Sequence, residues 1–399
     1  MQSGFVFSSE SVSEGHPDKL CDRISDAVVG HYLRLDPRAR VVAECALSTG
    51  IVFVSVRARS RASSVDVVDV VRATIRRIGY RDPALDADRC AVMTSIAEAP
   101  PAWRSGERVH PPLGDDEIDE LTAQDQATVF GYACRQTPEL MPLPIVLAHA
   151  LVRRMDDLRH RGDLPELDAD AKVQVSIEYA AGRPRRVYAI TLLASQQSNG
   201  DGHSRRLERH LRERVIEPVF ADREIRPDAR TRIAVNPDGP IVHGGPAHHA
   251  GLTGRKTAVD TYGEYARHSG AALSGKDPSR IDRSGAYAAR HAAKNVVAAG
   301  LAEQCEIALT YGIGLADPVS VQIETWGTST IPEDELAARV VRAIDLRVGA
   351  ILQRLGLRRL PHRDEHGFYP ALATYGHFGR EDLRAPWEAL DAVDALRAS

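Results

Sequence analysis

The stretch VVAECALSTGIVFVSVRA, residues 41–58, predicts a β-hairpin. Two runs rich in β-branched residues flank the turn signal Ser48-Thr49-Gly50. Over residues 65–79 apolar residues then recur at helical spacing, with serines before them and a glycine after them. The stretch therefore begins a unit made of one hairpin and one helix.

The same unit occurs twice more along the chain. Val173–Ala194 alternates as two strands, and a charged helical stretch follows over about residues 204–219. Cys305–Trp326 contains two strand-like runs around a turn at residues 312–318, and Pro332–Leu346 is predicted to be a helix with an acidic first turn. Identity between the units is weak, so the repeat is one of pattern.

Three such units predict an α+β protein of three pseudo-symmetric domains, each a β-sheet with helices packed on one face. We place these domains at residues 1–108, 122–243 and 244–390. The opposite sheet faces would need covering, which favours an oligomer. Residues 100–120 are Pro-rich and then acidic, which predicts a mobile loop or linker.

Composition excludes several classes of protein. The chain has 399 residues, of which 43% are hydrophobic and 27% charged, as expected of a soluble globular protein. Its net charge of −4 provides no global positive field for nucleic acid, and no apolar run is long enough for a membrane span. The N-terminus lacks a secretory signal, and the five scattered cysteines form no CxxC pair. We therefore expect a cytoplasmic protein with reduced core thiols.

The segment ESVSEGHPDK, residues 10–19, concentrates polar residues just ahead of a predicted helix. Pro17 suits a first helical position, so His16 and Asp18 are expected at a helix N-terminus. Backbone N–H groups there favour phosphate, but the same residues could simply cap the helix. Taken alone, the segment leaves both interpretations open.

Two further segments place cations beside glycines or carboxylates. In GLTGRK, residues 251–256, Arg255 and Lys256 follow two glycines and could clamp phosphate oxygens. In SGKDPSRIDRS, residues 274–284, cations alternate with aspartates, as a magnesium–polyphosphate site requires. A solvated charged turn before a helix over residues 283–299 is the alternative.

The segment AQDQATVFGY, residues 123–132, is less informative. Asp125 and Gln126 precede an apolar run, and we expect a helix entry there. The chain has neither GxxxxGK[ST] nor GxGxxG after a strand, which disfavours P-loop and Rossmann proteins. From the residues alone the prediction is an α+β protein that binds an anionic, metal-bound ligand.

Taken together, the motifs resemble the S-adenosylmethionine synthetase (methionine adenosyltransferase) family. The resemblance runs from Phe7 to Trp387 and includes ESVSEGHPDK, DPRARVVAE, FGYA, LMPLPI, DAKVQV, GLTGRK, SGKDPS and YGHFGRED. It implies three α+β domains related by pseudo-threefold symmetry. It also implies homodimers, possibly paired as tetramers, with active sites at the subunit interface. In the family's reaction a nucleophilic sulfur attacks C5′ of ATP and expels the triphosphate, which the same site then hydrolyses.

The resemblance also implies roles for individual residues. His16 matches the histidine near the bridging oxygen of the leaving triphosphate. Asp18 and Asp282 match the aspartates that hold magnesium, with two Mg²⁺ per site, and Glu44 matches a glutamate near a potassium ion. The predicted catalytic set is His16, Lys172, Arg255, Lys256, Lys276 and Arg280. The predicted ATP-binding set is Glu10, His16, Asp125, Lys172, Ile241, Arg255, Lys256 and Lys276.

The departures from the family gather in the acceptor pocket, which we predict from Arg57, Ala99, Asp125 and His249. Where the family recognises the ammonium of methionine with Glu, Gln and Asp, this chain has Arg57, Ala99 and His249. An ammonium about 4 Å from Arg57 would cost about 1 kcal/mol in water and several times more when partly buried. Ile241 also replaces the family's adenine-stacking Phe.

These departures favour an ATP-dependent adenosyltransferase whose small-molecule acceptor lacks an ammonium and can carry an anionic group. The alternative is an ordinary methionine adenosyltransferase with a rearranged pocket. A non-catalytic, nucleotide-binding relative is a third hypothesis, disfavoured because the residues expected to bind triphosphate are retained.

Overall fold

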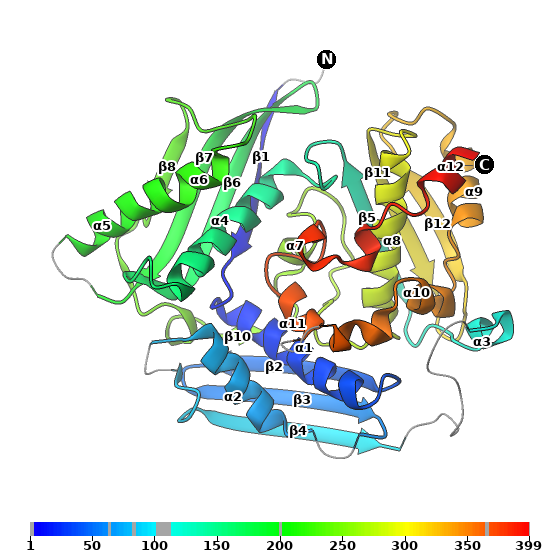
Figure 1. Cartoon of the computed structure of the whole chain (residues 1–399), viewed down its shortest axis with the longest axis horizontal. Coiled ribbons are helices and arrows are strands. Elements are labelled where there is room, and N and C mark those ends of the chain that lie inside the picture. The colour runs from blue at the N-terminus through cyan, green and yellow to red at the C-terminus, as the bar shows by residue number, and fades with distance from the viewer. Residues whose placement is uncertain are drawn as a thin grey trace.

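Three β-sheets form the framework of the protein (Figure 1). The computed structural model describes residues 4–62, 65–81, 85–100, 113–198, 202–363 and 367–398. Sheet A contains β1 (Phe5–Val12), β6 (Leu167–Ala180), β7 (Arg183–Gln196), β8 (Arg232–Val235) and β9 (Ile241–Val242). Sheet B contains β10 (Gly251–Leu252), β2 (Arg40–Ser48), β3 (Ile51–Arg59) and β4 (Ala91–Ala99). Sheet C contains β12 (Pro318–Glu324), β11 (Gln304–Tyr311) and β5 (Ala127–Cys134).

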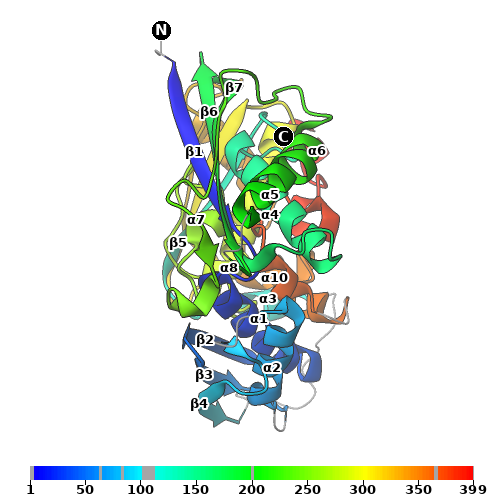
Figure 2. The same cartoon turned by 90° about the vertical axis from the view of Figure 1, so that its left-hand side faces the viewer.

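Each sheet carries its helices on one face. On sheet B lie α1 (Pro17–Leu35) and α2 (Val67–Ile78); on sheet A, α4 (Leu143–His160), α5 (His203–His210) and α6 (Glu217–Phe220); on sheet C, α8 (Ile281–Ala298) and α9 (Glu333–Ala343). Shorter helices are α3 (Asp115–Asp119), α7 (Thr257–Asp260), α10 (Val348–Arg354), α11 (Phe368–Leu372) and α12 (Val393–Ala398). Figure 2 shows the sheets gathered on one side of the molecule, with α2, α4, α5 and α6 on the other. The predicted α+β class, with helices on one sheet face, is confirmed.

The first hairpin shows why the sequence pattern predicts this layering. Alternate residues of β2 and β3 are buried against α1 and α2, and the others face outward. Helix α2 starts where the Asp66 side chain accepts a hydrogen bond from the N–H of Asp69 and ends at Gly79, whose φ is 73°. The hairpins and helices predicted in the other two units are also present.

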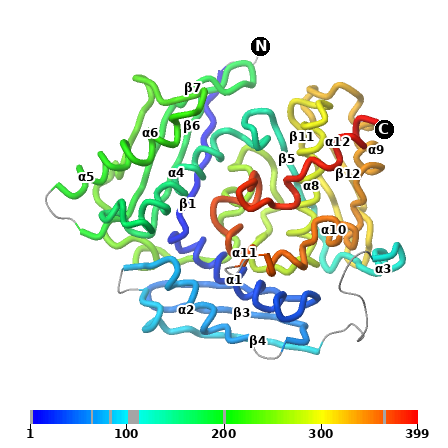
Figure 3. The backbone as a smooth tube through the Cα atoms, viewed as in Figure 1, coloured from blue at the N-terminus to red at the C-terminus, as the bar shows by residue number. Residues whose placement is uncertain are grey.

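The sheets do not follow the order of the chain. Strand β1 pairs with β6 from the middle of the sequence, as the tube trace shows (Figure 3), and β5 pairs with β11. The short strand β10 pairs with the edge of β2. Each sheet therefore contains a strand from another part of the sequence, and the sequence boundaries that we gave for the three domains stay a prediction.

The helix entry predicted at Asp125 and Gln126 is wrong, because these residues lead into strand β5. The run from Ala127 to Cys134 pairs with β11 along its whole length. Gly131 allows α8 to cross this strand closely: a Cβ there would lie 2.0 Å from the carbonyl carbon of Ala289. Tertiary pairing, rather than local helix signals, decides the segment.

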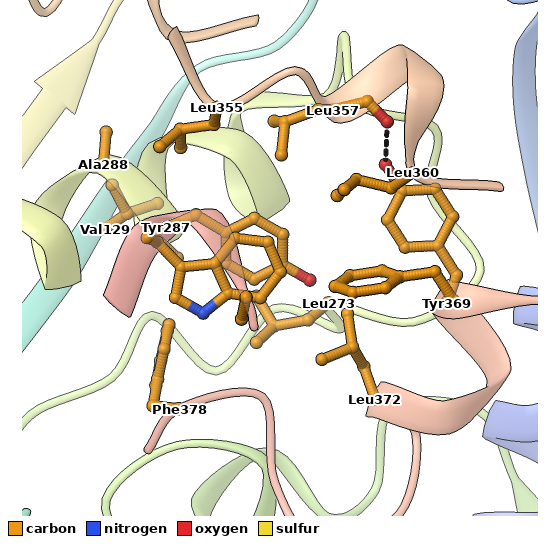
Figure 4. Packing of buried hydrophobic residues seen from close by; sticks show 14 of the residues in the cluster. Val129, Leu273, Tyr287, Ala288, Leu355, Leu357, Leu360, Tyr369, Leu372 and Phe378 are labelled. Atoms are coloured by element: carbon orange, nitrogen blue, oxygen red, sulfur yellow. Dashed lines mark hydrogen bonds between the residues drawn. The ribbon is translucent and has the colours of Figure 1, made fainter. Parts of the chain in front are cut away.

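A buried aromatic cluster fastens α8 to the C-terminal segment (Figure 4). Tyr287 stacks on Trp387 with ring centroids 3.7 Å apart, and the Tyr369 hydroxyl donates to the carbonyl of Leu357 at 2.6 Å. Arg283 lies over the Tyr369 ring and forms a fully buried pair with Asp26 of α1. The first turn of α8 is thus fastened to the middle of α1.

Three smaller predictions can be compared with the structure. All five cysteines are free and buried, as expected. The loop or linker predicted at residues 100–120 falls largely on 101–112, which lie outside the described residues; within the rest, residues 115–119 form α3. Among the described residues, no helix has the length and apolarity needed to cross a membrane.

Candidate active site

His16 caps the N-terminus of α1, and that cap determines which ring nitrogen carries its proton. The backbone N–H of Asp18 donates to His16 Nδ1 at 3.2 Å, so in the neutral ring the proton is on Nε2. Burial lowers the pKa of His16 from 6.5 to about 4, which keeps the ring neutral at pH 7. Capping and ligand binding are therefore compatible: the cap leaves an Nε2–H donor for another group.

Asp18, in the first turn of α1, lies between the two cations of GLTGRK. Its carboxylate accepts from Lys256 Nζ at 2.9 Å and from the N–H of Leu252 at 3.0 Å, and Arg255 lies 3.6 Å away. Burial raises the pKa of Asp18, but these hydrogen bonds outweigh it and the net pKa is lowered. Gly251 allows the close approach, because a Cβ there would lie 2.2 Å from the carbonyl oxygen of Pro17.

Strand β6 brings two more charged groups to this end of α1. Lys172 pairs with Glu10 of β1, with Nζ and Oε2 2.5 Å apart. Asp170 lies two residues earlier and accepts from the N–H of Gly245 at 2.7 Å. Our sequence analysis missed Asp170, although it opens the DAKVQV motif and has the strand period of two relative to Lys172.

His249 completes this first cluster. Its Nε2 lies 3.5 Å from Asp170 Oδ2, and its ring centroid is 4.9 Å from that of His16. The interaction with Asp170 raises the pKa of His249 above 6.5. His249 is exposed, whereas His16 is buried. An imidazole thus pairs with a carboxylate at the edge of the anion-binding residues.

A second cluster lies at the N-terminus of α8. Lys276 Nζ is 2.7 Å from Asp282 Oδ2, and Arg280 NH1 is 3.4 Å from Asp125 Oδ2. Lys276 also forms an isolated bridge to Val42 of β2. Lys276 and Asp282 thus pair within the motif of alternating charges, and Arg280 brings in Asp125 from a separate segment.

The two clusters are anchored at different points along α1. On α1, Asp18 holds the GLTGRK segment, while Asp26 accepts from the N–H of Gly275 at 2.9 Å, next to Lys276. These two anchors are eight residues apart, which corresponds to about 12 Å of helix. Each cluster presents cations beside a carboxylate, the combination that the sequence predicts for a polyanion site.

The remaining predicted residues lie at the surface. The face of sheet B that carries no helix holds three of them: Glu44 of β2, Arg57 of β3 and Ala99 of β4. The strand register places them together, because Arg57 pairs with Val42, two residues before Glu44. Ala99 pairs with Arg59, two residues after Arg57. Ile241 begins β9 and is half-buried. Arg57 therefore points away from α1, and not toward the His16 cluster of its own chain.

One cavity of the described residues lies away from the predicted site residues. It has a volume of about 320 Å³ and lies between α4 and residues 375–382 of the C-terminal segment. Its lining includes Arg153, Phe378 and Arg380, but none of the predicted site residues.

Fold and side-chain clusters define a class: a three-sheet α+β protein with cations paired to carboxylates at the N-termini of two helices. Comparison with known families agrees. The N-terminal, central and C-terminal domain models of S-adenosylmethionine synthetase match residues 4–101, 120–241 and 243–389. The chain belongs to the S-adenosylmethionine synthetase family.

Curated relatives span the whole chain. The S-adenosylmethionine synthase of Rippkaea orientalis is 46% identical over 100% of this chain and 97% of that protein. That of Synechocystis sp. is 47% identical over 99% and 95%, and that of Thermosynechococcus vestitus is 45% identical over 99% and 98%. The family resemblance and the enzyme class, a transferase of adenosyl groups, are confirmed. An atypical acceptor has no support from these relatives.

Proposed function

We propose that this protein is an ordinary methionine adenosyltransferase, which makes S-adenosylmethionine from ATP and methionine. The observation that carries the proposal is the cluster at the start of α1, where His16, Asp18 and Lys256 assemble the expected triphosphate site. The names of relatives that are nearly half identical over the full chain support methionine as the acceptor.

His16 is the proposed catalytic donor. Its Nε2–H is directed by the cap to donate a hydrogen bond to the bridging oxygen, where negative charge develops as the C5′–O5′ bond breaks. The neutral ring suits this role, because Nδ1 accepts from the Asp18 N–H and the one remaining N–H is left on Nε2 to donate. Lys172, Arg255, Lys256, Lys276 and Arg280 would neutralise the triphosphate.

The carboxylates fit the metals that the family uses. Asp18 and Asp282 offer the oxygen ligands that Mg²⁺ prefers, and each is now held by a lysine that a phosphate oxygen could engage instead. Bound magnesium would neutralise triphosphate charge. Glu44 is the proposed neighbour of a potassium ion. The proposal includes hydrolysis of the expelled triphosphate at the same site.

A homodimer would join the His16 cluster of one chain and the Lys276 cluster of the other into one proposed site. The helix-free face of sheet B carries Ile51, Phe53 and Met93, which are 50%, 40% and 56% exposed. Apolar side chains clustered on one open sheet face favour an interface. We propose that a second copy covers this face and brings Arg57 and the Lys276 cluster toward the partner's His16 cluster. Pairs of such dimers would form the tetramer that the family resemblance implies.

The acceptor with no ammonium remains a second candidate, favoured by one observation. The His249 imidazole lies 3.5 Å from Asp170 Oδ2, so it contacts the carboxyl group that would otherwise be available to bind an ammonium. Asp170 nevertheless places its carboxyl group beside His16, where the ordinary acceptor could use it. Methionine is therefore the better-supported acceptor.

The deciding experiment follows adenosyl products and triphosphate by mass spectrometry, with ATP, Mg²⁺ and K⁺ and with or without methionine. Turnover to S-adenosylmethionine at roughly 10 per second, the median for enzymes, is expected. ATP binding with no S-adenosylmethionine would refute methionine as the acceptor and favour the second candidate. Arg57→Glu, which restores the family residue, is the matched variant: a large gain in methionine use would also favour that candidate.

A further inference from the structure

Three metal-ligating side chains converge beside the proposed triphosphate site. His16, Asp170 and His249 each offer one ligand atom, and these atoms all lie within 4.8 Å of one another. They come from the start of α1, from β6 and from the loop before β10. No role in the proposed magnesium or potassium sites is assigned to this trio.

The chemistry of the trio differs from that of the magnesium carboxylates. Two imidazoles and one carboxylate suit Zn²⁺ and similar divalent transition metals, whereas Mg²⁺ prefers oxygen ligands. Ligand atoms around a tetrahedral zinc lie about 3.3 to 3.5 Å apart, given bonds of about 2.0 to 2.2 Å. The separation of His249 Nε2 and Asp170 Oδ2, 3.5 Å, already matches. We propose that His16, Asp170 and His249 form a site for Zn²⁺ or a similar transition-metal ion.

The surroundings can support such an ion. Asp170 is oriented by the N–H of Gly245 at 2.7 Å, and ligating carboxylates are usually held in this way. When His16 binds through Nε2, the proton moves to Nδ1, which then faces Asp18 Oδ2, now 3.9 Å away. That gives the carboxylate–histidine–metal arrangement common in zinc sites, at the cost of the bond from the Asp18 N–H. His249 is exposed, so no tight packing fixes its ring against an ion.

Occupancy has a consequence that rests on the proposed function. His16 cannot hold a metal on Nε2 and also donate an Nε2–H hydrogen bond to the leaving oxygen. Zn²⁺ at this site is therefore inhibitory, and His249 makes adenosyl transfer sensitive to zinc. Three protein ligands leave a fourth position open for water.

The test measures binding without substrates, so that it stands apart from the activity. The full chain is titrated with Zn²⁺ by calorimetry and with Co²⁺ by visible absorption. One ion per chain is expected. His249→Ala and Asp170→Asn should each weaken binding at least tenfold. His248→Ala is the matched control, because this neighbouring exposed histidine contacts the Val242 carbonyl instead, and it should bind as the wild type does.

Two results would overturn the site: no saturable binding by the wild type, or binding by His249→Ala equal to that of the wild type, which would place the ion on Asp18 instead. Circular dichroism of each variant checks that the fold is retained. In the activity assay, Zn²⁺ should inhibit the wild type in proportion to occupancy and should inhibit His249→Ala at least tenfold more weakly. Full activity at full occupancy would refute the inhibitory consequence while the binding data stand.

Discussion

Replacing His16 separates its two roles, helix cap and hydrogen-bond donor. His16→Ala removes both, whereas His16→Ser keeps a side-chain oxygen at the N-cap but loses the Nε2–H donor. The cap is worth about 0.5 to 2 kcal/mol, and a value at the low end is expected because the N–H···Nδ1 distance of 3.2 Å is long. The alanine variant should therefore melt below the serine variant.

Activity should behave differently. Removing one preorganised donor to a developing negative charge costs about 10²- to 10³-fold in kcat, or about 2.7 to 4 kcal/mol. Both variants should show this loss, with a much smaller change in the KM for methionine, because the donor acts on the leaving group.

Initial rates of S-adenosylmethionine and triphosphate formation measure kcat, and melting temperatures are compared at one protein concentration without ligand. The reasoning is refuted if His16→Ser keeps a kcat within about threefold of the wild type. His16 would then be only a cap. If His16→Ala and His16→Ser have equal melting temperatures and lose activity equally, the His16 side chain does not stabilise α1 as a cap.

Three other perturbations test the fold and the assembly. Phe53→Glu on the open face of sheet B should shift light-scattering mass from dimer to monomer and abolish activity, whereas Val341→Glu, exposed on α9, should do neither. Gly131→Ala should lower the melting temperature because its Cβ meets the α8 backbone; Gly30→Ala, with no atom within 4 Å, should raise it slightly, and the reverse order would contradict the packing. Glu388 is buried against the cations Arg290 and Lys294. Burial raises the pKa of Glu388, but the positive charges of these two partners outweigh burial, so the pKa falls below 4.5. The stability that Glu388 contributes is complete above about pH 4.5 and is lost as the pH falls through its lowered pKa. Glu388→Gln should lower the free energy of unfolding by about 3 to 5 kcal/mol at pH 7. If the melting temperature of this variant depends on pH as strongly as that of the wild type, Glu388 does not have this role.

Local signals in the sequence determined the repeated hairpin-and-helix units and the start of α1. Turn residues, strand alternation and caps such as Asp66 act within a few residues, so their outcome is independent of distant chain. The residues of the proposed anion site could be named for the same reason. Residue type and spacing alone single out His16, Asp18, Arg255 and Lys256. The resemblance to a known family added roles that spacing alone left open.

Only the tertiary structure decided which distant segments meet. Asp125 leads into a strand because β11 supplies the pairing partner, and no local pattern contains that information. Asp170 and His249 lie far apart in the sequence, and their contact depends on the loop that β10 anchors beside α1. The separation of the two cation clusters is likewise set by α1, whose length is visible in the sequence but whose neighbours are not. Long-range pairing and packing energies depend on the whole chain, which is why the complete site emerges only in the folded protein.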